Sequence, residues 1–132
     1  MIVGSRKFID RCHRFRKMFG GGMRQAGVLA AAGIYALENH IDRMADDHSR
    51  ARALAEAIGA VEGIQVDLDA VKTNMVYIDV SGTGMEASAV VEKLAAQDVS
   101  LTAVDNARLR AVTHLGIDDA GVHKAIEAFN NL

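Results

Sequence analysis

The sequence predicts an α/β protein, with helices in its first half and, in its second, a small sheet that carries helices on one face. Two observations support this. Apolar residues recur at helical spacing up to about residue 58, and short alternating segments typical of strands follow from Gly63 onward. The change divides the 132 residues into 1–60, whose helices lack apolar neighbours of their own, and 61–132, a compact α+β unit.

The first half begins with a basic amphipathic helix. Ser5 is a credible N-cap, and the aromatic residues of the apolar stripe are Phe8, Phe15 and Phe19. Residues 1–24 hold seven Lys or Arg against one acid, although the whole chain has a net charge of −2. Such a helix could touch nucleic acid, an anionic membrane or a partner. We favour a surface helix that packs on a core which this chain lacks, with no nucleic-acid or membrane partner.

Two further helices are expected before residue 60. The segment Gln25–Leu37 is apolar nearly all round, which predicts burial in a large core or a subunit interface. The next helix has an apolar stripe that ends at Ile58. Its charged face is interpreted as solvated surface, with Asp46 and Arg50 spaced for a weak ion pair.

The second half alternates strands and helices. Strands are predicted over residues 64–68, 74–80, 99–104 and 108–114. Thr83 and Glu86 have the spacing of a capping box for one helix, and Asp118 caps the last. On the 108–114 strand, Arg108 and Arg110 share one face with His114.

Composition limits the class of protein. Cys12 is the only cysteine, which excludes an internal disulfide and fits a reducing compartment, so a cytoplasmic location is expected. No apolar run reaches the ~20 residues of a membrane span, and no secretory signal pattern is present. The five histidines show no metal-ligand spacing.

The segment from Arg16 to Gln25 is the first candidate site. Lys17 and Arg24 flank three consecutive glycines, and a helix is expected to follow. Glycines allow close approach of a backbone, and a helix N-terminus attracts anions, so this segment could bind a phosphate. A flexible turn with ordinary surface cations is the alternative.

A second glycine-rich segment matches the dinucleotide fingerprint. Gly82, Gly84 and Ala87 have the spacing G-x-G-x-x-A, between a strand and a helix, and Asp105 follows about 20 residues on. Interpreted as that fingerprint, the segment would indicate an NAD- or flavin-dependent oxidoreductase. The other interpretation is a strand-to-helix turn in which the glycines serve only the turn.

Strand arginines supply the third candidate. The planar fork of Arg108 or Arg110 could bind a carboxylate or phosphate bidentately. Exposed strand arginines are more often ordinary surface.

Several blocks together resemble the low-specificity L-threonine aldolases, in order and approximate spacing. They are Val3-Gly4-Ser5, Arg16-Lys17, the run Gly20 to Gly27, Ala30-Ala31-Ala32, Tyr35-Ala36-Leu37, Thr73-Asn74-Met75-Val76, and Arg110-Ala111-Val112-Thr113-His114-Leu115. The resemblance covers essentially the whole chain but only the C-terminal part of the family's sequence.

The resemblance implies a pyridoxal-phosphate (PLP) enzyme of the aspartate-aminotransferase fold type, which cleaves L-threonine and L-allo-threonine to glycine and acetaldehyde. By position, Lys17 and Arg24 match residues near the cofactor phosphate, in a site shared between subunits. Arg110 matches the arginine that holds the substrate carboxylate. Residues 1–60 would then end the PLP-binding large domain and connect it to the small domain, 61–132.

One departure from the family bears on catalysis. The family's Schiff-base lysine belongs to a Ser-Lys-Gly motif that would precede Met1, and no such motif occurs here. We therefore expect a C-terminal portion that is inactive alone, contains no catalytic residue, and needs the N-terminal half or a homo-oligomer. A non-catalytic anion-binding or interaction domain stays open as the alternative, and the oxidoreductase is a weaker one.

Overall fold

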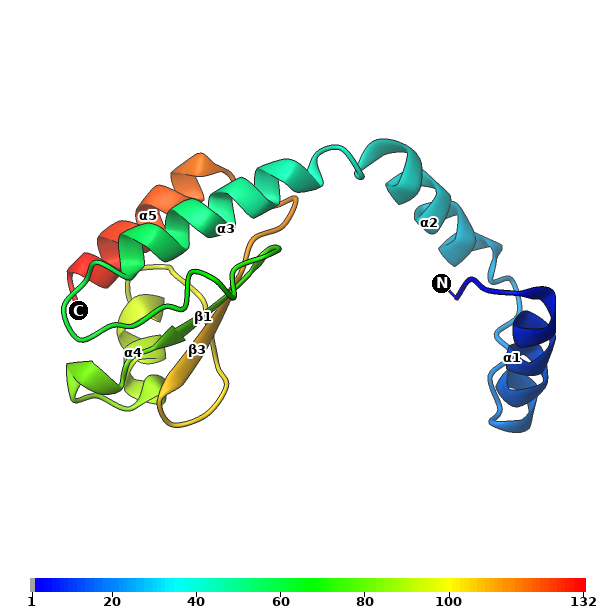
Figure 1. Ribbon diagram of the computed structural model, residues 1–132, viewed down its shortest axis with the longest axis horizontal. Coiled ribbons are helices and arrows are strands. Elements are labelled where there is room, and N and C mark those ends of the chain that lie inside the picture. The colour runs from blue at the N-terminus through cyan, green and yellow to red at the C-terminus, as the bar shows by residue number, and fades with distance from the viewer. Residues whose placement is uncertain (1) are drawn as a thin grey trace. The chain divides into compact units, whose positions relative to one another are not determined.

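The computed structural model describes residues 2–132, which form two compact units, 2–42 and 43–132. The first unit holds α1 (Arg6–Met18) and α2 (Gly27–Asn39). The second holds α3 (Met44–Ile58), β1 (Met75–Asp79), a 3₁₀ turn η1 (Ser81–Thr83), α4 (Ala87–Ala95), β2 (Thr102–Ala103), β3 (Arg108–Val112) and α5 (Asp119–Asn130) (Figure 1). The predicted division into 1–60 and 61–132 stays a prediction.

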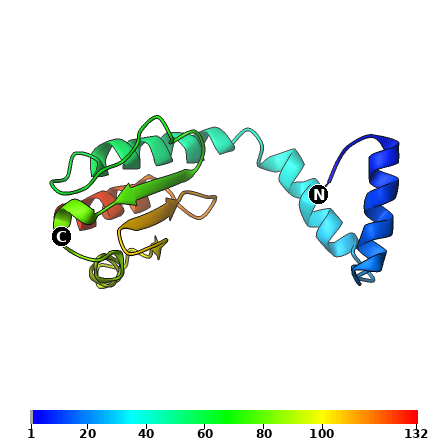
Figure 2. The same cartoon turned by 60° about the horizontal axis from the view of Figure 1, so that its bottom comes forward.

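The second unit is a three-stranded antiparallel sheet in the order β1-β3-β2. The inward side chains of β1 and β3 pack against the helices, and α3 and α5 also pack against each other (Figure 2). The core is aliphatic apart from Phe129, and its fully buried members include Ile58, Ile78, Leu94 and Leu109. The expected sheet with helices on one face is confirmed.

Strand alternation accounts for this layering. Val76 and Ile78 on β1 and Leu109 on β3 are fully buried, whereas Tyr77 and Arg108 point to the other face and are exposed. The predicted alternation is therefore correct on both central strands. Two other predicted strands are much shorter: residues 64–68 make only the bridge Gln65↔Asp79, and 99–104 pairs only at Thr102 and Ala103.

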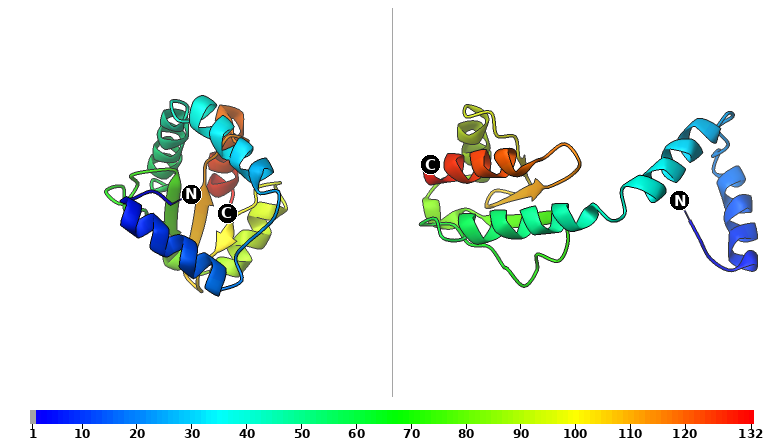
Figure 3. Two further views of the ribbon diagram at one scale, coloured as in Figure 1. Left: turned by 90° about the vertical axis from the view of Figure 1, so that its right-hand side faces the viewer. Right: turned by 90° about the horizontal axis from the view of Figure 1, so that it is seen from above.

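The first unit has no core of its own. Ser5 caps α1 by accepting a hydrogen bond from the Phe8 N–H, as predicted, but no side chain of α1 or α2 is buried. Phe19 is 84% exposed, and Leu29 and Tyr35 on α2 are also well exposed. Figure 3 shows α1 and α2 as two helices joined by a loop. Large exposed apolar side chains are therefore numerous on both helices, which soluble monomers rarely present when they form one patch.

The charged face of α3 is not simply solvated surface. Asp47 is buried and receives two hydrogen bonds from the Arg43 guanidinium, at 3.0 and 2.5 Å. Arg50 pairs with Asp119 on α5 at 2.7 Å, and the predicted Asp46–Arg50 pair is wrong. Arg50 connects two helices instead, because the α5 N-terminus lies within its reach.

The Arg43–Asp47 pair predicts acid lability. The hydrogen bonds from Arg43 lower the pKa of Asp47, against the opposing effect of burial. A lowered folded-state pKa stabilises the fold above the unfolded value of about 3.9 and loses that contribution as pH falls through the folded value. Asp47→Asn should therefore flatten the decline of Tm below about pH 5. Asp46→Asn is the control, and an unchanged acid profile in Asp47→Asn would contradict the assignment.

Candidate functional site

The outer face of the sheet presents a cation between two neighbours. Arg110 on β3 pairs in register with Tyr77 on β1 and with Thr102 on β2. Because directly opposed residues point to the same face, these side chains flank the arginine. Tyr77 is 48% exposed, and Met75 and Val112 on the same face are partly exposed. The face therefore combines the apolar side chains around Arg110 with a charged end, where Asp79 pairs in register with Arg108.

The two strand arginines differ in their partners. The Arg108 Nη2 and Nε lie 2.6 and 2.7 Å from Oδ2 of Asp105, and this contact raises the pKa of Arg108 and lowers that of Asp105. Asp105 also accepts the backbone N–H groups of Ala107 and Arg108, which closes the turn before β3. Arg108 is thus engaged within its own turn.

Arg110 lacks any such engagement. Its Nε is buried and has no hydrogen-bond partner among residues 2–132. A buried donor without a partner is unfavourable by about 1–3 kcal/mol, so an acceptor that reaches it is favoured. The structure therefore distinguishes Arg110, whose Nε has no partner among the described residues, from Arg108, which is paired with Asp105.

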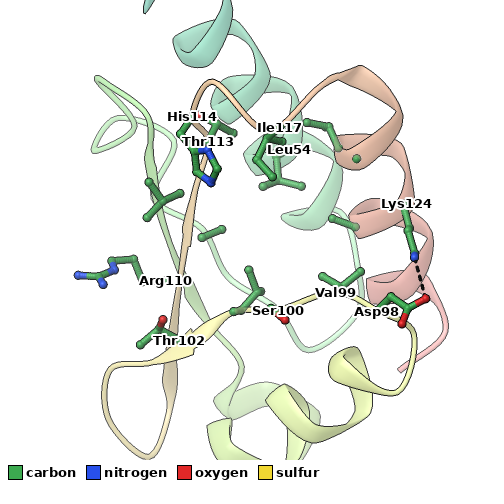
Figure 4. A pocket seen from close by; sticks show the side chains of 16 residues that line it. Leu54, Asp98, Val99, Ser100, Thr102, Arg110, Thr113, His114, Ile117 and Lys124 are labelled. Carbon is green, nitrogen blue, oxygen red and sulfur yellow. Dashed lines mark hydrogen bonds and ion pairs between the residues drawn. The ribbon is translucent and has the colours of Figure 1, made fainter. Parts of the chain in front are cut away.

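A cavity of about 350 Å³ opens along the edge of β3, and Arg110 is one of the residues that line it (Figure 4). Its walls are mostly aliphatic, and the Lys124–Asp98 ion pair, 3.1 Å long, lies at its rim. In Figure 4 the Arg110 side chain extends away from the aliphatic wall residues Leu54, Val99 and Ile117. Arg110 therefore borders this cavity at the edge where β2 and β3 meet.

In the first unit, the glycine-rich loop has the backbone geometry that the sequence suggested. Gly20 has φ +78°, and the Gly21 N–H donates to the Arg16 carbonyl at 2.7 Å, which folds the loop onto the last turn of α1. A Cβ on Gly21 would lie 2.9 Å from the Arg16 side chain. The following helix starts at Gly27, later than expected, after Gln25 at φ +54°.

The two cations of this loop are free to bind an anion. Lys17 and Arg24 are exposed, and no ion pair among residues 2–132 includes either of them. A Cβ on Gly22 would lie 3.8 Å from the Lys17 Nζ, so this glycine is beside the amine. Exposed cations next to an open glycine backbone fit a phosphate group.

The dinucleotide interpretation does not fit the observed geometry. The fingerprint requires a parallel βαβ unit, whereas β1 pairs antiparallel with β3. Gly82 lies against Gly63, and a Cβ on it would come within 2.7 Å of the Gly63 carbonyl oxygen. The capping box is also absent: the Thr83 hydroxyl donates to Val80 and accepts from the Met85 N–H. These glycines serve a turn.

Comparison with known proteins identifies the family. The Beta-eliminating lyase family matches residues 1–81, more than half of the chain, and the chain belongs to this family. It is 37% identical over 130 residues to low-specificity L-threonine aldolase 1 of Arabidopsis thaliana, and the aligned region covers 98% of this chain and 36% of the relative. The low specificity L-threonine aldolase of Escherichia coli K12 is 42% identical over 117 residues, covering 89% and 33%. The chain spans about a third of the length of these relatives.

A solved structure supports the fold. A mutant of C-DES with glycine covalently linked to its PLP cofactor superposes with a TM-score of 0.64 at 20% identity, over 81% of this chain and 28% of that one. The predicted fold, an α/β arrangement shared with part of that structure, is confirmed. Among residues 2–132, no helix is long and apolar enough to cross a membrane.

Proposed function

We propose that this chain is a C-terminal portion of a PLP-dependent aldolase that cleaves L-threonine and L-allo-threonine to glycine and acetaldehyde. The observation that carries the proposal is the unpartnered, buried Nε of Arg110 on the open face of the sheet. The identity of 37–42% to threonine aldolases supports it. When bound, PLP supplies an electron sink for carbon–carbon cleavage, and the protein orients the substrate.

Each candidate residue has a distinct part in this proposal. Arg110 binds the substrate carboxylate through its planar fork, which fixes the amino acid's orientation and hence which Cα bond is aligned for cleavage. Lys17 and Arg24 hold the cofactor phosphate, in a site shared between subunits. The residues that react directly belong to a preceding segment of the enzyme, so the 132-residue chain alone does not cleave threonine.

The exposed first unit fits the same proposal. The apolar surfaces of α1 and α2 are covered by the preceding segment or by a second subunit of a homo-oligomer, because neither helix buries a side chain by itself. A non-catalytic interaction domain would also need such a partner. The substitutions below separate the two, because only the enzyme depends on Arg110.

The first prediction compares the strand arginines in an enzyme where a threonine-aldolase N-terminal part precedes this chain. Arg110→Ala should reduce kcat/KM for threonine by a factor that corresponds to about 2–5 kcal/mol of transition-state stabilisation, because a desolvated ion pair is lost. Arg110→Lys keeps the charge but loses the fork and should rescue only partly. Arg108→Ala, the matched control, should have a much smaller effect. A larger loss in Arg108→Ala would overturn the proposed carboxylate site.

The second prediction concerns the cofactor phosphate. Lys17→Gln or Arg24→Gln should each raise the dissociation constant of PLP about 10-fold or more, as expected for losing a charge-assisted hydrogen bond. Retention is measured by equilibrium dialysis. Lys7→Gln and Arg14→Gln remove a cation from the same helix away from the glycine loop and should change it little. Equal losses in all four variants would indicate general charge attraction instead.

The third prediction concerns the 132-residue chain by itself. Treatment with PLP and borohydride should give no single stoichiometric adduct, because none of its five lysines lies in a Ser-Lys-Gly motif. Peptide mapping of the reduced chain and a threonine-cleavage assay measure this. One dominant modified lysine together with cleavage would contradict the assignment of the reactive residues to a preceding segment.

A further inference from the structure

Thr113 is a buried polar residue in a row of otherwise apolar core positions. It follows Leu109 and Ala111 on the inward face of β3, and its side chain is 2% exposed. Its hydroxyl donates a hydrogen bond of 2.7 Å to the backbone carbonyl of Asp47, in the first turn of α3. The bond joins the end of β3 to a helix 66 residues earlier in the chain.

The backbone of Thr113 is also held on the other side. Its N–H donates to the Asn74 carbonyl at 2.9 Å, and the Asn74 side-chain amide donates to the Thr113 carbonyl at 2.8 Å. Asn74 directly precedes β1, so the β1–β3 ladder is closed by a side chain after its last regular pair, Met75↔Val112. Thr113 thereby connects β1, β3 and α3.

The hydroxyl is not required to satisfy the Asp47 carbonyl. That carbonyl lies inside α3, where the N–H four residues on, Ala51, is its regular partner. Valine has nearly the same shape as threonine and would fill the same buried space. The hydroxyl therefore adds a tether between strand and helix rather than repairing an unsatisfied group.

The tether matters most at this end of the strand. Among residues 2–132, β2 pairs with β3 only at Leu109 and Arg110, so beyond Arg110 one edge of β3 has no neighbouring strand. The cavity lies along this open edge (Figure 4). The end of β3 that follows Arg110 is supported by β1 on one side and by the Thr113–Asp47 bond.

We propose that Thr113 is a positioning residue that holds the Arg110 guanidinium in place for the substrate carboxylate. The inference rests on the proposed carboxylate role of Arg110. Thr113 touches no reacting atom. It fixes the backbone three residues after Arg110. The Arg110 guanidinium therefore does not have to be ordered when the amino acid binds. Its loss is expected to weaken recognition of the carboxylate selectively.

The test measures carboxylate recognition separately from turnover, in the enzyme with its N-terminal part and PLP bound. Glycine and methylamine differ by the carboxylate, and the affinity of each is measured from the cofactor's absorbance change. The ratio of the two affinities reports the contact with the carboxylate. Thr113→Val should lower this ratio about three- to tenfold, the scale of one hydrogen bond. Thr113→Ser, which keeps the hydroxyl, should restore it.

Thr83→Val is the matched control. Its hydroxyl also donates to a backbone carbonyl at 2.7 Å, that of Val80, but it lies in the turn before α4. It should lower Tm without changing the affinity ratio. Arg110→Ala should lower the ratio most, and adding Thr113→Val to it should lower the ratio no further. That non-additivity is the signature of a residue that acts through Arg110.

The remaining outcomes separate the two levels of the argument. If Arg110→Ala lowers the ratio while Thr113→Val changes only Tm, the positioning role is overturned and the proposed function stands. If Arg110→Ala leaves the ratio unchanged, the carboxylate site itself is overturned, and the role of Thr113 with it. If Thr113→Val does not fold, Asn74→Ala is the second variant, because it removes the hydrogen bond from the Asn74 side-chain amide to the Thr113 carbonyl. It should lower the same ratio, and an unchanged ratio would overturn the inference.

Discussion

The antiparallel register of β1 against β3 is the constraint on which the rest of the structure depends. With Ile78 opposite Leu109, the inward residues of both strands meet the helices, and Arg110 falls beside Tyr77 on the outer face. Because side chains alternate along a strand, a slip of one residue would bury Arg110 and expose Leu109. The core and the candidate site are thus specified by the same pairing, which the contacts between Asn74 and Thr113 close at its end.

The proposed ligand-binding residues are divided between two units, of which only the second buries a hydrophobic core of its own. The second unit buries its own aliphatic core and holds Arg110 on a regular strand. The first unit carries Lys17 and Arg24 beside a glycine loop with a left-handed residue, but its helices bury no side chain. The unit that would bind the phosphate therefore depends on other protein surface, whereas the unit that would bind the carboxylate does not.

Much of this arrangement could be predicted from the sequence, because its signals are local. Alternation at Val76 and Ile78 and the N-caps at Ser5 and Asp118 correctly predicted the central strands and two helix starts. The candidate residues came from the family resemblance. From the residues alone, Arg108 and Arg110 were equivalent, and the structure distinguishes them by the Asp105 contact of Arg108 and the unpartnered Nε of Arg110.

What could not be predicted depends on contacts between distant segments. Residues 64–68 alternate like a strand, yet only Gln65 finds a partner. Arg50 has acids at helical spacing, but it pairs with Asp119 on another helix. The Gly82 segment fits a nucleotide fingerprint locally, and its role as a turn follows from its close contact with Gly63. The Thr113 tether likewise has no signal in local spacing.

The most direct test of this account is a crystal structure of the enzyme, with its N-terminal part, PLP and glycine bound. The account predicts two contacts in that structure. The glycine carboxylate lies within hydrogen-bond distance of the Arg110 guanidinium, and Arg108 is still paired with Asp105. A carboxylate held by Arg108, or one bound away from the outer face of the sheet, would contradict it.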